Sequence, residues 1–241
     1  MNIFGNEEED FPSERLINAA SLGRADQLVS AIRDGGDVDH IRLDIAPTLI
    51  CAMRQYSECL EILMQSGASA SVPNRMGWTA LHEASQKEDP ACLQIILNNP
   101  DRTKFLALDN KGTTALVAAL EYGRFDNANM LVKAEPRLLS ATDLEGSNAV
   151  LWAVQAKNAE ALKWLLQKGA SAEETNEKGL SAQTEVFSWD EGKALVEEFG
   201  YIAKERIASE NASKNQDKAQ EEEKKPSNPF GLGEARKKKT V

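Results

Sequence analysis

Short stretches of apolar residues alternate with polar breaks along most of the chain, and within each stretch the apolar positions follow a helical period. One stretch, for example, places Leu60, Leu63 and Met64 on a single helical face. Each such stretch follows another apolar segment of about eight residues, from which it is separated by a polar break such as residues 122–124. The pattern predicts pairs of short antiparallel helices, repeated along the chain.

The repeating unit is marked by the segment 79–84, which reads Thr-Ala-Leu-His-Glu-Ala. Related segments begin at Glu14, Ala46, Thr79, Thr114, Asn148 and Ser181, at intervals of 32, 33, 35, 34 and 33 residues. Several units close with a glycine, as expected where the second helix ends. This spacing predicts six repeats within residues 12–203, near 12–43, 44–76, 77–111, 112–145, 146–178 and 179–203.

The unit resembles the ankyrin repeat, whose first helix starts with Thr-Pro-Leu-His-x-Ala. Residues 79–84 differ from that motif only at Ala80, whereas the other units are degenerate: Pro47 is the only proline kept and His82 the only histidine. The resemblance covers roughly residues 12–201. It implies an all-α ankyrin-repeat solenoid of helix-turn-helix units with short β-turn or hairpin tips, in which stacked units share one continuous core.

Histidine and cysteine are assigned structural roles. At the family's motif position, His82 is expected to hydrogen-bond across the turn and to join neighbouring units. Cys51, Cys59 and Cys92 have neither C-x-x-C spacing nor a histidine at a metal-ligand interval. They are therefore expected to be buried thiols in a reducing compartment, and no metal site is predicted.

The two ends of the chain differ from the repeats. Residues 1–11 form an acidic N-terminal segment without the basic start and apolar stretch of a secretory signal. No apolar run approaches the roughly 18 residues that would span a bilayer. We expect a cytoplasmic protein with no membrane insertion, and export without an N-terminal signal stays open. Residues 204–241 lose the apolar periodicity and are predicted to be a disordered charged tail.

Two short signals lie in that tail. Asn228, Pro229 and Phe230 resemble the NPF ligand read by EH domains, and the alternative is an ordinary flexible turn. The basic run at 236–239 suits a weak nuclear-import or anionic-surface patch, or solubility alone.

Charge and motif content narrow the function classes. The chain carries 28 Lys/Arg against 38 Asp/Glu, a net charge of −10. Residues 203–241 hold 10 Lys/Arg and 7 Asp/Glu, net +3, so the preceding 202 residues hold 18 and 31, net −13. An acidic body disfavours nucleic-acid binding because phosphates would be repelled. No catalytic or nucleotide-binding motif occurs in the sequence, so we predict neither an enzyme nor a cofactor.

The resemblance implies that turn tips and first helices line a concave surface. Position by position, the partner-binding candidates on it are Arg42, Arg54, Arg75, Met76, Trp78, Lys87, Lys111 and Tyr122, with Met53 beside them. Arginine and aromatic side chains dominate interface energies, and a basic face on an acidic protein would attract an acidic peptide or surface. The alternative is that these are scattered solvent-exposed residues.

Three functions remain open. The first is a non-catalytic adaptor, monomeric when unbound, that binds another protein through the concave face. The second is a secreted bacterial effector that binds a host protein, with the tail as an export or recruitment signal. The third is a stoichiometric inhibitor or regulatory subunit of an enzyme. The acidic run at 221–223 also has the charge needed to fold back onto Arg54 and Arg75.

Overall fold

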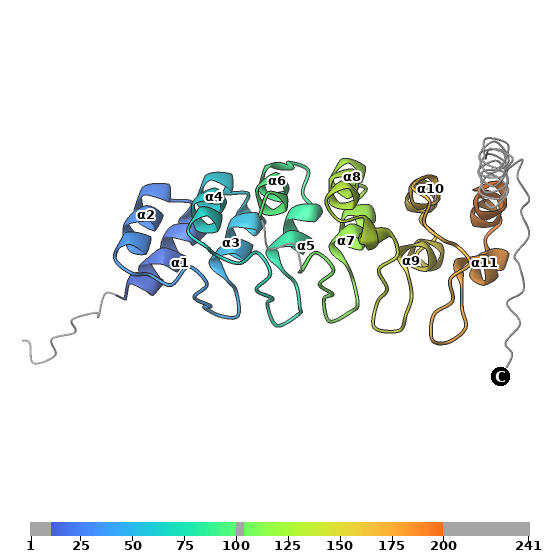
Figure 1. Cartoon of the computed structure of the whole chain (residues 1–241), viewed down its shortest axis with the longest axis horizontal. Coiled ribbons are helices and arrows are strands. Elements are labelled where there is room, and N and C mark those ends of the chain that lie inside the picture. The colour runs from blue at the N-terminus through green and yellow to red at the C-terminus, as the bar shows by residue number, and fades with distance from the viewer. Residues whose placement is uncertain (1–10, 100–103, 200–241) are drawn as a thin grey trace, which may run out of the picture. The chain divides into compact units, whose positions relative to one another are not determined.

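The computed structural model describes residues 11–99 and 104–199. The chain divides into two compact units, Met1–Glu197 and Glu198–Val241. The described part of the first unit consists of antiparallel helix pairs connected by long loops (Figure 1). The predicted tail 204–241, its Asn228-Pro229-Phe230 motif and residues 1–10 of the acidic segment lie outside the described residues, and what the sequence suggests for them stays a prediction.

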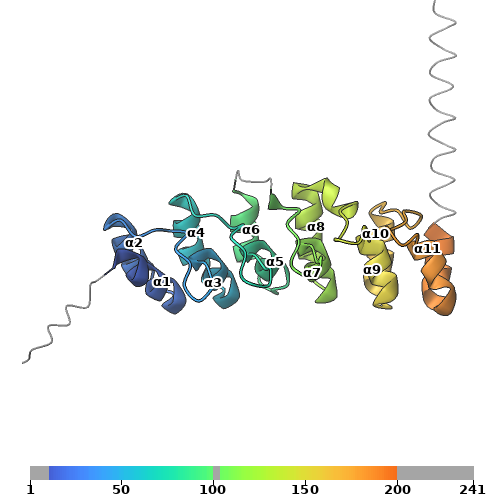
Figure 2. The ribbon, with the colours of Figure 1, turned by 90° about the horizontal axis from the view of Figure 1, so that it is seen from below.

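The helices form two rows, which Figures 1 and 2 show from perpendicular directions. The first helices of the pairs are α1 (Pro12–Leu22), α3 (Pro47–Arg54), α5 (Ala80–Ser85), α7 (Ala115–Glu121), α9 (Ala149–Gln155) and α11 (Ala182–Glu185). The second helices are α2 (Ala25–Arg33), α4 (Ser57–Gln65), α6 (Ala91–Leu97), α8 (Phe125–Ala134) and α10 (Ala159–Gln167), and residues 190–199 are helical after α11. Short 3-10 turns, η2 (Pro136–Leu139) and η3 (Val186–Ser188), follow α8 and α11.

The structure confirms the all-α class. Within residues 11–99 and 104–199 the extended contacts are limited to isolated bridges, Arg42 with Ile45 and Thr142 with Asn148. Each first helix packs on the first helix of the next pair, as α3 does on α1 and on α5. One cluster of buried apolar side chains runs without a break from Leu16 to Val196. A single pair could not bury its apolar stripe alone, so stacking is what closes the core.

Four of the first helices are capped by the residues that mark the repeats, whereas α1 begins at Pro12, ahead of Glu14. Thr114 accepts a hydrogen bond from the backbone N–H of Val117, and Asn148 does the same for Leu151. Capping boxes begin α5 at Thr79 and α11 at Ser181. Each cap satisfies an N–H that the helix leaves unpaired, so local chemistry fixes where every one of these helices starts.

Five of the first helices end in one of two ways, whereas α11 runs into the 3-10 turn η3. Four of them are followed by a residue in the left-handed region, which lets the chain reverse direction: Gly23, Gln55, Gly123 and Lys157. After α5 the chain takes no such residue, and the next repeat supplies the partners instead. Asn127 Nδ2 donates to the carbonyls of Ser85 and Lys87, at 2.9 and 2.7 Å, and Arg124 Nε donates to Gln86 at 3.1 Å.

Candidate functional site

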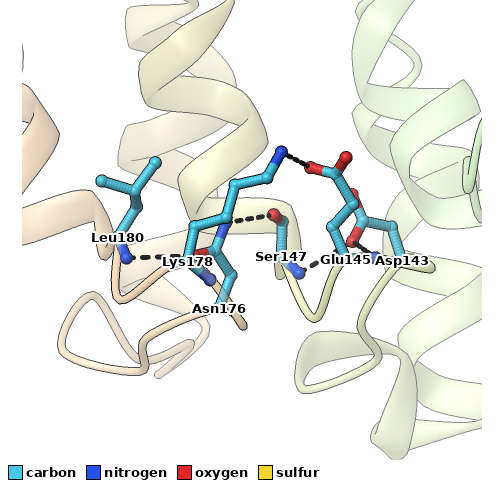
Figure 3. Close-up of polar contacts among 6 residues, drawn as sticks. All are labelled: Asp143, Glu145, Ser147, Asn176, Lys178 and Leu180. Atoms are coloured by element: carbon cyan, nitrogen blue, oxygen red, sulfur yellow. Dashed lines mark hydrogen bonds and ion pairs between the residues drawn. The ribbon is translucent and has the colours of Figure 1, made fainter.

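The loops between repeats end in five tips, which we number 1 to 5 (residues 42–45, 74–78, 109–113, 143–147 and 176–180). Tips 2 to 5 share one construction, an Asn or Asp followed three residues later by a glycine. In tip 4, Asp143 Oδ1 accepts the backbone N–H groups of Glu145 and Ser147, both at 2.8 Å. Asn176 does the same in tip 5 for Lys178 and Leu180 (Figure 3). These contacts explain why the tips keep a defined shape without flanking strands.

Two pairs of neighbouring tips, 2 with 3 and 4 with 5, are also joined by hydrogen bonds. Figure 3 shows tips 4 and 5, where Lys178 Nζ lies 2.6 Å from Glu145 Oε2 and Asn176 Nδ2 donates to Ser147 Oγ at 3.0 Å. Tip 3 is joined to tip 2 through the backbone, since Asn110 N–H donates to the Met76 carbonyl at 2.8 Å. The glycines permit this approach because a Cβ on Gly77 would lie 2.8 Å from the Asn110 nitrogen. The tips of neighbouring repeats therefore also hold one another in place within these two pairs.

Tip 1 is built differently. Arg42 and Ile45 exchange two backbone hydrogen bonds, of 3.3 and 3.1 Å, across a two-residue turn. Both turn residues have positive φ, 52° at Leu43 and 64° at Asp44, the geometry of a type I′ turn that asparagine and glycine normally occupy. Leu43 is also 85 % exposed. The first tip thus presents an apolar side chain from a backbone conformation that leucine rarely adopts.

Tips and first helices share one face, which we call the inner face. A pocket of about 240 Å³ opens between α1, tip 1 and α3, and we call it the α1–α3 pocket. Its lining residues are Ile17, Ser21, Arg42, Leu43, Ile45, Ile50, Met53 and Arg54. A smaller pocket of about 60 Å³ joins tip 3 and α7 to tip 4 and α9, with Lys111 and Trp152 among its lining residues. The sequence indicated Arg42, Met53 and Arg54 but not the three isoleucines or Leu43.

The predicted contact residues fall into two groups by exposure. Six are exposed on the inner face: Arg42, Arg54, Arg75, Met76, Lys111 and Tyr122. Trp78 and Lys87 are only half-buried, and both are engaged by Glu83 of α5. Trp78 Nε1 donates to Glu83 Oε2 at 3.0 Å, while Lys87 Nζ lies 2.6 Å from Glu83 Oε1. These two side chains therefore also hold tip 2 and the end of α5 in place.

The cationic character of the face is reduced by internal pairing. Arg42 lies 3.2 Å from Glu14 and donates to Asn18 at 2.8 Å, and Arg75 lies 2.5 Å from Asp44. Together with Lys87, three of the five predicted cations thus have an acidic neighbour. Arg54 and Lys111 form no ion pair within 4.0 Å in the described part of the chain.

His82 has the structural role that the resemblance implied. Its ring is fully buried, with Nδ1 2.9 Å from Thr79 Oγ1 and Nε2 3.0 Å from the carbonyl of Thr113 in the next repeat. The Trp78 ring lies against it, with 5.0 Å between ring centroids. Burial lowers the pKa of His82 and outweighs the hydrogen bond to Thr113, which acts in the opposite direction. The imidazole is thus a neutral link between repeats.

The cysteines are buried free thiols, as predicted. Burial raises the pKa of Cys92 to about 11 and raises the pKa of Cys51 as well, so both stay protonated at neutral pH. Within residues 11–99 and 104–199, no group of three or more His, Cys, Asp or Glu side chains is placed to hold a metal ion. In the same residues no helix has the length and apolar character needed to cross a membrane.

Relatives and solved structures share the repeat. The chain is 27 % identical over 175 residues to the neurogenic locus notch homolog protein 1 of Xenopus tropicalis, covering 72 % of this chain and 6 % of that protein. It is 26 % identical over 182 residues to the B-cell lymphoma 3 protein homolog of Mus musculus, covering 73 % of this chain and 40 % of that protein. The chain therefore spans only a part of these relatives' length.

Two solved structures have the same fold. The ankyrin repeat domain of Bcl-3, described as a unique member of the IkappaB protein family, superposes with a TM-score of 0.69 at 22 % identity, covering 78 % of this chain and 85 % of that one. The ankyrin repeat protein EF0377 gives 0.66 at 19 % identity, covering 76 % and 96 %. A family model for ankyrin repeats in three copies matches residues 16–104, 48–140 and 103–176. With these matches, its Thr-Ala-Leu-His motif and its stacked helix pairs, the chain belongs to the ankyrin-repeat family.

Proposed function

We propose that this chain is a non-catalytic interaction module that binds a partner protein through its inner face, and that the partner presents an acidic peptide or surface. Ankyrin repeats typically serve protein–protein interaction, and that general role is the frame of the proposal. The observation that carries it is the set of exposed side chains on the inner face for which the fold has no use. These are Met53, Arg54, Met76, Lys111 and Tyr122.

The chemistry of that set indicates the kind of partner. Tyr122 is 54 % exposed and Met76 is 59 % exposed, so both leave apolar surface in contact with water on the inner face. Arg54 and Lys111 add positive charge that no described carboxylate neutralises. Apolar area beside unpaired cations favours an acidic protein surface, because a carboxylate can take guanidinium hydrogen bonds while the neighbouring apolar groups leave water.

A regulatory role is the second candidate. The observation behind it is the similarity to Bcl-3, a member of the IkappaB protein family by its description. A regulatory chain would hold its partner in a stable stoichiometric complex. In that case the same inner face would be used, and the complex would survive size-exclusion chromatography at a fixed ratio. An adaptor with transient partners would dissociate during the same separation.

The proposal is tested by affinity capture with the full chain and three variants. We expect Arg54→Glu/Tyr122→Ala to lose the partner, because both substitutions remove exposed inner-face groups without touching the core. The control is Arg33→Glu/Val29→Ala, which makes the same charge change and a smaller apolar loss on α2, in the other row of helices. Phe230→Ala probes the tail motif. Loss of the partner with Phe230→Ala but not with the inner-face variant would refute the proposal and move binding to the tail.

A further inference from the structure

We propose that the α1–α3 pocket receives one apolar side chain from an acidic segment of the partner, with a carboxylate beside that side chain bound by Arg54. This inference rests on the proposed function, since it assumes that the inner face binds a protein. It also specifies which part of the inner face holds the partner and which residue types the partner must have there.

The pocket has the size and lining of a single side-chain site. Its volume of about 240 Å³ lies below the roughly 300–1,000 Å³ typical of pockets for small organic ligands. Ile17, Ile45 and Ile50 supply the walls, and Leu43 and Met53 stand at the opening, 85 % and 44 % exposed. An inserted apolar side chain would remove this surface from water, which is the main source of affinity in a buried anchor.

Tip 1 keeps this pocket open at an energetic cost. Leu43 stays in the left-handed region, whereas the corresponding turns in tips 2 to 5 use glycine for positive φ. This conformation is unfavourable for a residue with a Cβ, because the Cβ lies too close to the following carbonyl oxygen. Arg42, which contacts Glu14 and Asn18 of α1, ties the tip to the first helix. The pocket is therefore formed before any partner arrives, and a strained residue lines it, as is common at binding sites.

The charge of the side chains that line the pocket favours an acidic occupant. Arg42 and Arg54 line the pocket and no acidic residue does. Two carboxylates beside tip 1, those of Glu14 and Asp44, are each already engaged by an arginine. Among residues 11–99 and 104–199, no group bonds to the Arg54 guanidinium, and a guanidinium holds a carboxylate with two parallel hydrogen bonds. A partner segment with acidic residues beside an apolar side chain would fill the apolar pocket and also bind the Arg54 guanidinium.

The test uses methyl NMR of the full chain labelled at isoleucine, with three synthetic peptides as probes. The first carries a phenylalanine between two pairs of glutamates, the second replaces the phenylalanine by serine, and the third replaces all glutamates by glutamine. We expect saturable shifts of the Ile45 and Ile50 methyl groups with the first peptide only. Ile62 of α4 and Ile95 of α6, which lie in the other row of helices, should not move.

Matched variants separate the charge from the fold. Arg54→Glu should weaken binding of the first peptide about tenfold or more, because it removes a charge-assisted contact, while Arg33→Glu on α2 should leave the affinity unchanged. Leu43→Ser, at an exposed position outside the core, should also weaken it. Equal binding of the glutamine peptide would overturn the acidic requirement. Shifts of Ile45 and Ile50 with protein concentration alone would make a second copy of the chain the occupant.

Failure here and failure of the proposed function give different results. If the partner is captured through Arg54 and Tyr122 but its own segments leave Ile45 and Ile50 unshifted, the inner face binds and the pocket assignment is wrong. If the acidic peptide fills the pocket but the Arg54→Glu/Tyr122→Ala variant still captures the partner, the pocket assignment stands for the peptide and the proposed function is wrong.

Discussion

At the scale of single residues, the left-handed position after the first helices shows how backbone conformation alone affects stability. Gly23 and Gly123 occupy it in two repeats, whereas Lys157 occupies it after α9 with φ 51°. In this conformation the Cβ of a lysine lies unfavourably close to the following carbonyl oxygen, whereas glycine has no Cβ. The repeats share one sequence pattern, but Lys157 stands at a left-handed position that glycine adopts more easily.

We predict that Lys157→Gly stabilises the protein by about 0.5–1 kcal/mol, because relief of the strain exceeds the extra entropy that glycine gives the unfolded chain. Urea unfolding should show a higher midpoint with an unchanged slope. Gly123→Ala is the matched control, since a Cβ there meets no atom within 4 Å and only φ opposes it. It should lower the midpoint; a stabilising Gly123→Ala would contradict the backbone argument.

The second prediction at this scale concerns His82 and pH. Burial holds its pKa below the ordinary value of 6.5, so the unfolded chain takes up this proton at a higher pH than the folded chain. The contribution to stability is complete above pH 6.5 and is lost as pH falls from there through the lowered pKa. His82→Asn should be less stable at pH 7, since it removes the links to Thr79 and Thr113, yet lose less stability between pH 6.5 and 5.

Unfolding free energies across that pH range measure the effect, with His40→Asn as the comparison that removes the other histidine. Equal slopes for the His82 variant and the natural chain would show that His82 does not carry the acid sensitivity.

At the scale of elements, the end of α5 depends on the following repeat. No left-handed residue follows this helix, and Asn127 of α8 donates to the carbonyl of Ser85 at its end and to that of Lys87 just beyond it. We predict that Asn127→Ala costs about 1–3 kcal/mol, because the carbonyls of Ser85 and Lys87 lose their donor at a buried site. Asn129→Ala, on the same helix, should cost little. Hydrogen exchange should rise first in α5 and residues 86–90, and a uniform rise along the chain would contradict this local account.

The elements were predictable where their signals are local. The caps at Thr79, Thr114, Asn148 and Ser181 stand at the residues that mark the repeat, because a helix start is decided within four residues. The Asn or Asp three residues before each tip glycine was equally visible in the sequence as a turn signal, and it would have predicted the shape of tips 2 to 5.

The candidate site was only partly predictable, because its charges are set by contacts between distant residues. Arg42 meets Glu14, 28 residues earlier, and Arg75 meets Asp44 in the preceding tip. Sequence position placed both arginines on the inner face but could not show that their charge is largely matched there. The pocket depends in the same way on Ile17 and Ile50, which share it only once α1 packs on α3.

At the scale of the whole molecule, each repeat should be stabilised by its contacts with the neighbouring repeats. Leu116 lies in α7, fully buried in the middle of the core, and Val186 is buried near the C-terminal end of it. We predict that Leu116→Ala costs about 2–5 kcal/mol and raises hydrogen exchange in repeats on both sides, because a central unit supports two interfaces. Val186→Ala should cost less and raise exchange mainly from residue 171 onward, since the last repeat supports one.

The same two substitutions should differ in their effect on binding at the inner face. The α1–α3 pocket lies at the N-terminal end, far along the chain from Val186, so Val186→Ala should leave binding of the acidic peptide unchanged even where α11 is loosened. Leu116→Ala should weaken that binding only at temperatures at which the central repeats open. If Val186→Ala instead raised exchange equally in α1 to α4 and weakened the peptide, the repeats would unfold as one unit, and a nearest-neighbour description of this chain would be wrong.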